Sequence, residues 1–171
     1  AMRGGSLIQD LQLRDFTINA MAIDIHQEPY QIIDPLGGAA DLKAKTLRAC
    51  SSHTFEQDPV RVLRAVRLAT ELNFYLEANT KSWLKAAVPL LHRPSVERLR
   101  DEIWRIFSGK QPATALRTLH TLGAFSALFP EVAALENIEQ SPPHIYNVFT
   151  HTLTLIDKLN HIFDWLCYGK R

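Results

Sequence analysis

The spacing of apolar residues changes near Thr54. Before that point two apolar runs, INAMAIDI and YQIIDP within residues 18–34, flank the short polar segment HQEP, and this pattern predicts a β-hairpin. The DPLGG that follows predicts a turn in which Gly37 and Gly38 are free to take positive φ. DLKAKTLRAC then predicts a helical turn and one short strand, so the strands are expected within residues 18–49.

Beyond Thr54 the apolar spacing is helical. Helices are expected at 58–73, 79–91, 95–108, 112–122 and 147–166, with stops at Gly109, Gly123 and Pro130. In RPSVERLRDEIWRIF, Ser95 is the expected N-cap, and the expected inner face consists of Leu99, Ile103, Ile106 and Phe107. Trp83 and Trp104 are expected to anchor the core rather than to stack on bases.

The opening AMRGGSLIQDL shows neither a strand nor a cap, and two or three strands rarely form a stable sheet alone. We therefore expect the chain to be the C-terminal part of a longer protein. The overall prediction is an α+β fold, with a short opening sheet followed by a long helical remainder.

Composition adds little to this picture. The 171 residues are 46% hydrophobic and 22% charged with a net charge of +1, which is ordinary for a soluble globular protein and means that any nucleic-acid surface must be local. Cys50 and Cys167 match no metal or disulfide pattern. No apolar run approaches the roughly 20 residues of a membrane span, and the N-terminus lacks a signal-peptide core. A cytoplasmic protein without membrane association is expected.

The stretch EQDPVRVLRAVR carries an unusual charge pattern. Asp58 followed by Pro59 predicts a helix start, with Asp58 as the N-cap. Arg61, Arg64 and Arg67 follow three residues apart, so they form a slowly drifting stripe on one side of the helix. Like charges at this spacing repel unless an anion lies among them or water screens them.

Two other short motifs precede this one, LRDFTINA (13–20) and DPLGGAADL (34–42). Taken singly, each has a structural interpretation: a surface ion pair, a loop closed by glycines, or a solvated helix face. In this order and spacing the three resemble the motifs of class II nucleotidyltransferases, the tRNA CCA-adding enzymes and bacterial poly(A) polymerases. The resemblance covers about residues 6–130.

The resemblance implies an architecture of head, neck and body. Residues 1–55 would be the C-terminal part of the nucleotidyltransferase head, and residues 56–130 would be the helical neck and body that bind nucleotide and RNA. Residues 131–171 resemble the start of an HD-type region, in which His151 takes the place of the first metal-type histidine. Because Asn147 replaces the usual acid there, no metal is assigned to it.

Site residues are also implied by the resemblance. Arg14 would contact the nucleotide phosphates, and Asp15 and Asn19 would hold the ribose or shape the site. Asp58 and Arg61 would form a protein template that reads the base edge of CTP or ATP, because a carboxylate accepts from an exocyclic amine and a guanidinium donates to a ring nitrogen or carbonyl. The set of implied nucleotide-binding residues is completed by Arg64 and Arg67.

Two positions depart from the family pattern: Leu13 replaces a second arginine, and Gln57 replaces an acid, which leaves the fine nucleotide preference open. The family's Mg²⁺-binding aspartates lie upstream of the first motif, and no matching pair occurs in this sequence. No catalytic or metal-binding residue is therefore assigned to the chain, which by itself is expected to be inactive.

The implied activity is the addition of CMP or AMP to RNA 3′ ends, with ATP and CTP as substrates, Mg²⁺ as cofactor and tRNA or another RNA as partner. The basic residues of the later helices, Arg93, Arg98, Arg100, Arg105 and Lys110, form either a phosphate surface or a mixed solvated face. The alternative is a non-catalytic helical RNA-binding module. An HD-domain phosphohydrolase is disfavoured because its histidine–aspartate pair is missing.

Overall fold

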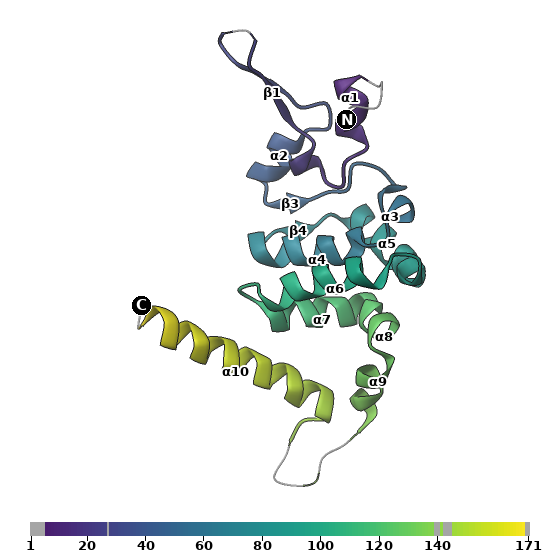
Figure 1. Cartoon of the computed structure of the whole chain (residues 1–171), viewed down its shortest axis with the longest axis vertical. Coiled ribbons are helices and arrows are strands. Elements are labelled where there is room, and N and C mark those ends of the chain that lie inside the picture. The colour runs from purple at the N-terminus through teal and green to yellow at the C-terminus, as the bar shows by residue number, and fades with distance from the viewer. Residues whose placement is uncertain (1–5, 27, 139–140, 142–144, 170–171) are drawn as a thin grey trace.

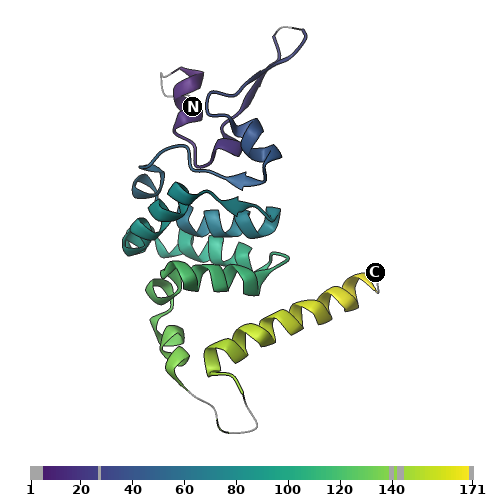
Figure 2. The same ribbon diagram turned by 180° about the vertical axis from the view of Figure 1, so that it is seen from behind.

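The computed structural model describes residues 6–26, 28–138, 141 and 145–169. A small mixed part at the N-terminal end sits on a stack of helices, and a long C-terminal helix leaves the stack at an angle (Figures 1 and 2). The α+β class and the change of character near Thr54 are confirmed.

The N-terminal part contains six short elements: α1 (Leu7–Gln12), the 3-10 helix η1 (Thr17–Asn19), β1 (Ala22–Asp24), β2 (Gln31–Ile33), α2 (Gly38–Lys43) and β3 (Thr46–Leu47). The expectation that the opening segment has no cap is wrong. Ser6 and Gln9 form a capping box: Ser6 Oγ accepts from the Gln9 N–H at 3.3 Å, and Gln9 Oε1 accepts from the Ser6 N–H at 3.1 Å. Leu11 of this helix is fully buried.

The predicted hairpin is confirmed as the antiparallel pair β1–β2, in which Ala22 lies opposite Ile33; residue 27 of its connection lies outside the described residues. Residues 18–21, at the start of the expected strand region, form η1 and a bend instead. A second pairing is not predicted by the sequence. Strand β3 pairs in parallel with β4 (Tyr75–Leu76), where the Tyr75 N–H donates to the Lys45 carbonyl at 2.8 Å.

The glycine pair at the start of α2 joins the first two motifs. Gly37 has a φ of 74°, as predicted, but Gly38 does not have positive φ. Glycine is required at position 38 for space, because a Cβ there would lie 2.1 Å from the Thr17 carbonyl oxygen. Asp41 of α2 strengthens the same contact, since its Oδ2 accepts from Thr17 Oγ1 at 2.7 Å.

The helical part contains α3 (Thr54–Gln57), α4 (Arg61–Leu72), α5 (Ala78–Ala87), η2 (Val88–His92), α6 (Val96–Phe107), α7 (Pro112–Leu122), α8 (Ala124–Leu128), α9 (Pro130–Ala133), η3 (Ala134–Asn137) and α10 (Val148–Tyr168). The five expected helices are therefore all present: α7 has the expected bounds, the ends of the others are shifted by a few residues, and the end of the one expected at 79–91 is the 3-10 helix η2. None of the helices in the described part of the chain is both long enough and apolar enough to cross a membrane.

Helix α4 lies at the centre of the stack and packs on both α6 and α7. Its Leu63 and Val66 are fully buried. The inner face expected for α6 is confirmed for Leu99, Ile103 and Ile106 but is wrong for Phe107, which is 45% exposed.

The two tryptophans behave differently. Trp83 is partly buried against the core, as expected. Trp104 is 72% exposed, so the expectation that it anchors the core is wrong. Buried Ile106 and half-buried Ile103 set the inner side of α6, and Trp104, one residue from Ile103, is turned outward.

Candidate nucleotide-binding site

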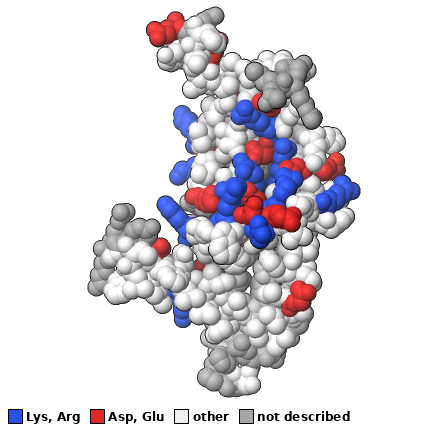
Figure 3. Space-filling view, in the orientation of Figure 1, with Lys and Arg blue, Asp and Glu red and all other residues white. Residues whose placement is uncertain are grey.

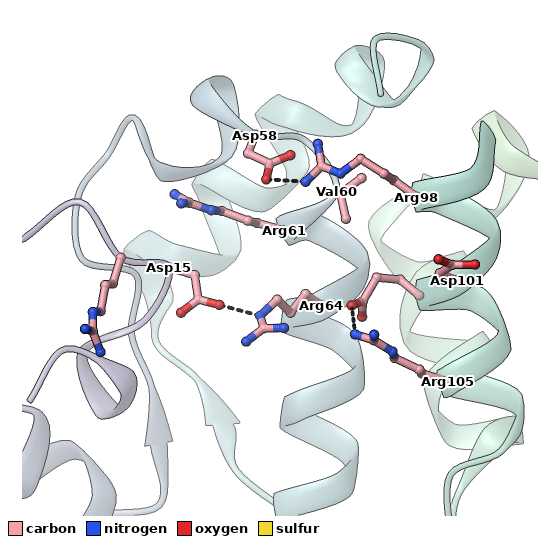
Figure 4. Close-up of a pocket in the computed structure, with 10 residues that line it drawn as sticks. Asp15, Asp58, Val60, Arg61, Arg64, Arg98, Asp101 and Arg105 are labelled. Carbon is pink, nitrogen blue, oxygen red and sulfur yellow. Dashed lines mark hydrogen bonds and ion pairs between the residues drawn. The ribbon is translucent and has the colours of Figure 1, made fainter. Parts of the chain in front are cut away.

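A cavity of about 450 Å³ lies between α4, α6 and the loop that follows α1. Its volume is in the range of small-molecule sites. Five arginines and four carboxylates line it together with one apolar residue: Arg14, Arg61, Arg64, Arg98, Arg105, Asp15, Asp58, Asp101, Glu102 and Val60. Figure 4 shows Arg61 and Arg64 on α4 and Arg98 and Arg105 on α6, whereas Asp15 and Asp58 come from segments outside these two helices.

Asp58 does not cap α4. That helix begins at Arg61 with Val60 at the N-cap position and no side-chain cap, so the predicted cap is wrong. The Asp58 carboxylate instead accepts through Oδ2 from Arg98 Nη2 at 2.7 Å. Oδ1 is buried and has no hydrogen-bond partner among the described residues. A buried acceptor without a donor is unfavourable by about 1–3 kcal/mol, so this oxygen is a position where a ligand donor would stabilise the site.

The three arginines of α4 have different surroundings. Arg61 donates to two backbone carbonyls, those of Thr54 at 3.2 Å and Leu13 at 3.3 Å. Arg64 donates through Nε to Asp15 Oδ2. The anions expected among these arginines are therefore in part the protein's own carboxylates.

Arg67 is separated from the cavity. It does not belong to the lining, its side chain is 11% exposed, and it pairs with Glu102 and Glu71, both at 2.9 Å. Burial acts to lower the pKa of Arg67, and the two carboxylates outweigh that effect, so the pKa is raised from its usual value. Arg67 thus anchors α6 to α4 through Glu102.

The first motif forms the opposite wall. Asp15 Oδ1 accepts from the Phe16 N–H at 2.9 Å and from Asn19 Nδ2 at 3.2 Å, while Oδ2 faces Arg64. Arg14 Nη1 donates to the Asn19 carbonyl at 2.9 Å. Asn19 itself does not line the cavity, so it orients the two residues that do.

Cys50 lies beside this wall, where its N–H donates to the Asp15 carbonyl. Burial, followed by the charge of Asp15, raises the pKa of the Cys50 thiol to about 12. The thiol is therefore protonated near neutral pH and is not a nucleophile of the site.

Arg98, Glu102 and Arg105 extend the site beyond the residues that the motifs indicate. Arg105 Nη1 donates to Glu102 Oε1 at 2.8 Å, and the hydrogen bond to Asp58 raises the pKa of Arg98. The sequence marks Arg98 and Arg105 as part of a basic surface. Their position at the cavity cannot be predicted from the sequence, because it depends on how α6 packs on α4. Arg98 follows Asp58 by 40 residues in the chain.

Charged side chains gather over the middle of the molecule, where blue and red atoms are interleaved (Figure 3). This arrangement does not fit a metal ion. Among the described residues no group of three or more His, Cys, Asp or Glu side chains could hold one. The cavity carboxylates Asp15, Asp58 and Glu102 are each paired with an arginine.

Two family models match the chain. The poly(A) polymerase head domain matches residues 2–48, and the probable RNA- and SrmB-binding site of polymerase A matches residues 73–136. The CC-adding tRNA nucleotidyltransferase of Geobacter sulfurreducens is 39% identical over 128 residues, which cover 75% of this chain and 29% of that protein. The chain belongs to the tRNA nucleotidyltransferase and poly(A) polymerase family.

Other members of the family agree with this assignment. The A-adding tRNA nucleotidyltransferase of Deinococcus radiodurans is 34% identical over 159 residues, covering 90% of this chain and 36% of that protein. A solved tRNA-processing enzyme with CTP is 33% identical, with a TM-score of 0.78 over 97% of this chain and 43% of that one. The chain thus spans about a third of the length of these curated relatives.

The segment that resembles an HD-type region is described only in part, because residues 139–140, 142–144 and 170–171 lie outside the described residues. Asn147 caps α10, where its Oδ1 accepts from the Thr150 N–H at 2.8 Å. His151 is exposed in the first turns of that helix. The replacement of the usual acid by Asn147 thus has a structural role as a helix cap.

Proposed function

We propose that this chain carries the base-reading and phosphate-contacting part of the nucleoside triphosphate site of an enzyme that adds CMP or AMP to the 3′ end of tRNA or another RNA. The single observation that carries the proposal is Asp58, a residue of the arginine-lined cavity, three residues before Arg61, whose buried Oδ1 has no hydrogen-bond partner among the described residues. The proposed substrates are ATP and CTP, and the proposed location is the cytoplasm.

The chemistry of the bases explains why this oxygen matters. Cytosine and adenine both carry an exocyclic amine, whereas uracil and guanine present a carbonyl oxygen at the equivalent position. An amine donates to a carboxylate oxygen, and a carbonyl oxygen there would face it with two acceptors opposed. Asp58 therefore favours CTP and ATP over UTP and GTP, and Arg61 donates to the neighbouring ring acceptor.

The remaining cavity arginines provide charge rather than base selectivity. Arg14 and Arg64 lie on the side of the first motif, next to Asp15. A triphosphate offers charge-assisted acceptors that compete for these guanidinium groups. Magnesium ions used in the transfer are expected to bind carboxylates other than those of this cavity.

The same reasoning extends to the domain limits. We infer that residues 1–55 belong to the head, residues 56–130 to the neck and body, and residues 131–171 to a helical continuation. The change from short strands to stacked helices between β3 and α4 supports the first limit.

The test is equilibrium binding of CTP and UTP to the 171-residue chain and to Asp58→Ala, with Arg64→Ala as the comparison. Asp58→Ala is expected to reduce the preference for CTP over UTP by about 5- to 150-fold, which corresponds to the 1–3 kcal/mol of an unpaired polar group. Arg64→Ala is expected to weaken both nucleotides by a similar factor, because phosphate contacts carry no base identity.

Melting temperatures of the variants serve as the control. If the CTP preference is unchanged in Asp58→Ala, the residue does not read the base. If wild type binds RNA but neither nucleotide at millimolar concentration, the alternative of a non-catalytic RNA-binding module is favoured instead.

A further inference from the structure

Helix α6 presents a tryptophan to solvent beside the nucleotide cavity. Trp104 is 72% exposed, and Arg100, one turn earlier on the same face, has a side chain that is 70% exposed. Phe107, one turn later, is 45% exposed. The outer face of α6 thus combines two aromatic rings with a guanidinium group. These side chains are not needed to hold the helix on α4, because its inner face supplies those contacts.

A second cavity, of about 440 Å³, is formed at this face by Arg100, Asp101, Trp104 and Arg105. Two of these residues, Asp101 and Arg105, also line the nucleotide cavity. Figure 4 shows both of them on α6 at the edge of that cavity, on the same helix as Arg98. The two cavities are therefore neighbours on α6 that share Asp101 and Arg105 in their linings.

We propose that Trp104 is the stacking platform for an unpaired base at the 3′ end of the RNA substrate, with Arg100 and Arg105 contacting the adjacent phosphates. This inference rests on the proposed function, since the RNA end must lie next to the nucleotide that it receives. An indole ring stacks on any base, and stacking combined with cationic side chains is the usual design of single-strand binding surfaces.

The charges of the surface fit a polyanion better than a protein segment. Arg100 pairs with exposed Asp101 at 3.2 Å, an ion pair that costs little to exchange for a phosphate. Arg105 keeps its bond to Glu102 through Nη1, and its side chain is still 57% exposed. The helix also lies within residues 73–136, which match the RNA-binding family model.

The experiment measures binding of an eight-nucleotide single-stranded RNA ending in CC, labelled at its 5′ end, by fluorescence anisotropy with the 171-residue chain. Trp104→Ala is expected to weaken binding about tenfold or more, as is typical for loss of one stacked base, and Trp104→Phe is expected to retain most of the affinity. Quenching of tryptophan emission by unlabelled RNA in wild type, absent in Trp104→Phe, identifies the stacked ring.

Two further variants give matched controls. Trp165→Ala removes another tryptophan, 57% exposed on α10 and part of neither cavity lining, and is expected to leave RNA affinity unchanged. Arg100→Gln is expected to lower the slope of log affinity against log salt by about 0.7, the value for one phosphate of a single strand.

Three results would overturn the inference: no binding of the RNA to wild type, equal affinity in Trp104→Ala, or a wild-type dimer that Trp104→Ala converts to monomer while RNA affinity is unchanged. The third result would assign the face to a second copy of the chain. CTP binding separates this inference from the proposed function, because Trp104→Ala is expected to bind CTP as wild type does. If wild type binds RNA but not CTP, and Trp104→Ala loses RNA binding, the RNA surface would be supported and the nucleotide site contradicted.

Discussion

At the scale of single residues, the Asp58 carboxylate is held by Arg98 of α6 and not by the start of α4. The sequence Asp-Pro predicts an N-cap, but Asp58 has φ −147° and ψ 93° and directs its carboxylate away from the first turn of α4. Its partner comes from α6. The residue types of the site were therefore predictable from the sequence, whereas the geometry that gives Asp58 one paired and one unpaired oxygen was not.

Arg98→Ala is expected to reduce the preference for CTP over UTP by about threefold to tenfold, because the Asp58 carboxylate loses the contact that orients it. Stability should change little, since the Arg98 side chain is 55% exposed and such ion pairs contribute less than about 1 kcal/mol. The measurement is nucleotide binding together with thermal melting, and Arg98→Lys is expected to restore part of the preference.

Arg100→Ala is the matched control for that variant. This variant also removes an arginine side chain of α6. Arg100 is two residues from Arg98 and does not line the cavity that contains Asp58. Equal losses of CTP preference in the Arg98 and Arg100 variants would mean that general positive charge, rather than orientation of Asp58, is responsible.

At the scale of elements, the sequence predicts helices with local signals better than strands that form at a distance. Helix α7 has the bounds 112–122 that the pattern indicates, because Pro112 starts it and Gly123, with φ 79°, ends it. Strand β4 has two residues and pairs with β3 nearly 30 positions earlier. Neither alternation nor a turn signal can identify so short a parallel pair from the sequence.

The link between α4 and α6 gives a stability prediction. Glu102, with a side chain 7% exposed, pairs with Arg67 and Arg105, so Glu102→Ala leaves the 11% exposed Arg67 with one carboxylate fewer. The free energy of unfolding is expected to fall by about 1–3 kcal/mol, less than for a buried charge left without any partner, because Arg67 keeps its ion pair with Glu71. Urea denaturation measures it, and Glu102→Gln, which keeps the shape and an acceptor, is expected to lose less.

Glu71→Ala is the control for this link. Glu71 also pairs with Arg67, at i, i+4 on α4, but its side chain is 33% exposed, so the expected loss is only about 0.3–0.5 kcal/mol. A similar loss in the Glu71 and Glu102 variants would mean that the buried pair between α4 and α6 contributes no more to stability than the more exposed pair within α4.

At the scale of the whole molecule, the packing of α10 differs along its length. Phe149 and Leu153 near its start are buried in the core, and Asp157 pairs with Arg117 of α7 at 2.7 Å. Residues 161–167 are all exposed. Both ribbon views show the C-terminal end of the helix lying away from the stack (Figures 1 and 2). The first half of α10 therefore belongs to the folded core, and the second half is held mainly by its own backbone.

Hydrogen exchange followed by mass spectrometry should resolve this gradient. Amides of residues 62–69 in α4, whose side chains include the fully buried Leu63 and Val66, are expected to exchange only through global unfolding. Amides of residues 161–167 are expected to exchange several orders of magnitude faster, because a short stretch of helix without tertiary contacts is marginal in water. Repeating the measurement at tenfold lower protein concentration separates local opening from association. Protection of residues 161–167 that disappears on dilution would mean that a second copy covers the exposed Phe163 and Trp165, and protection that persists would contradict the expected gradient within the single chain.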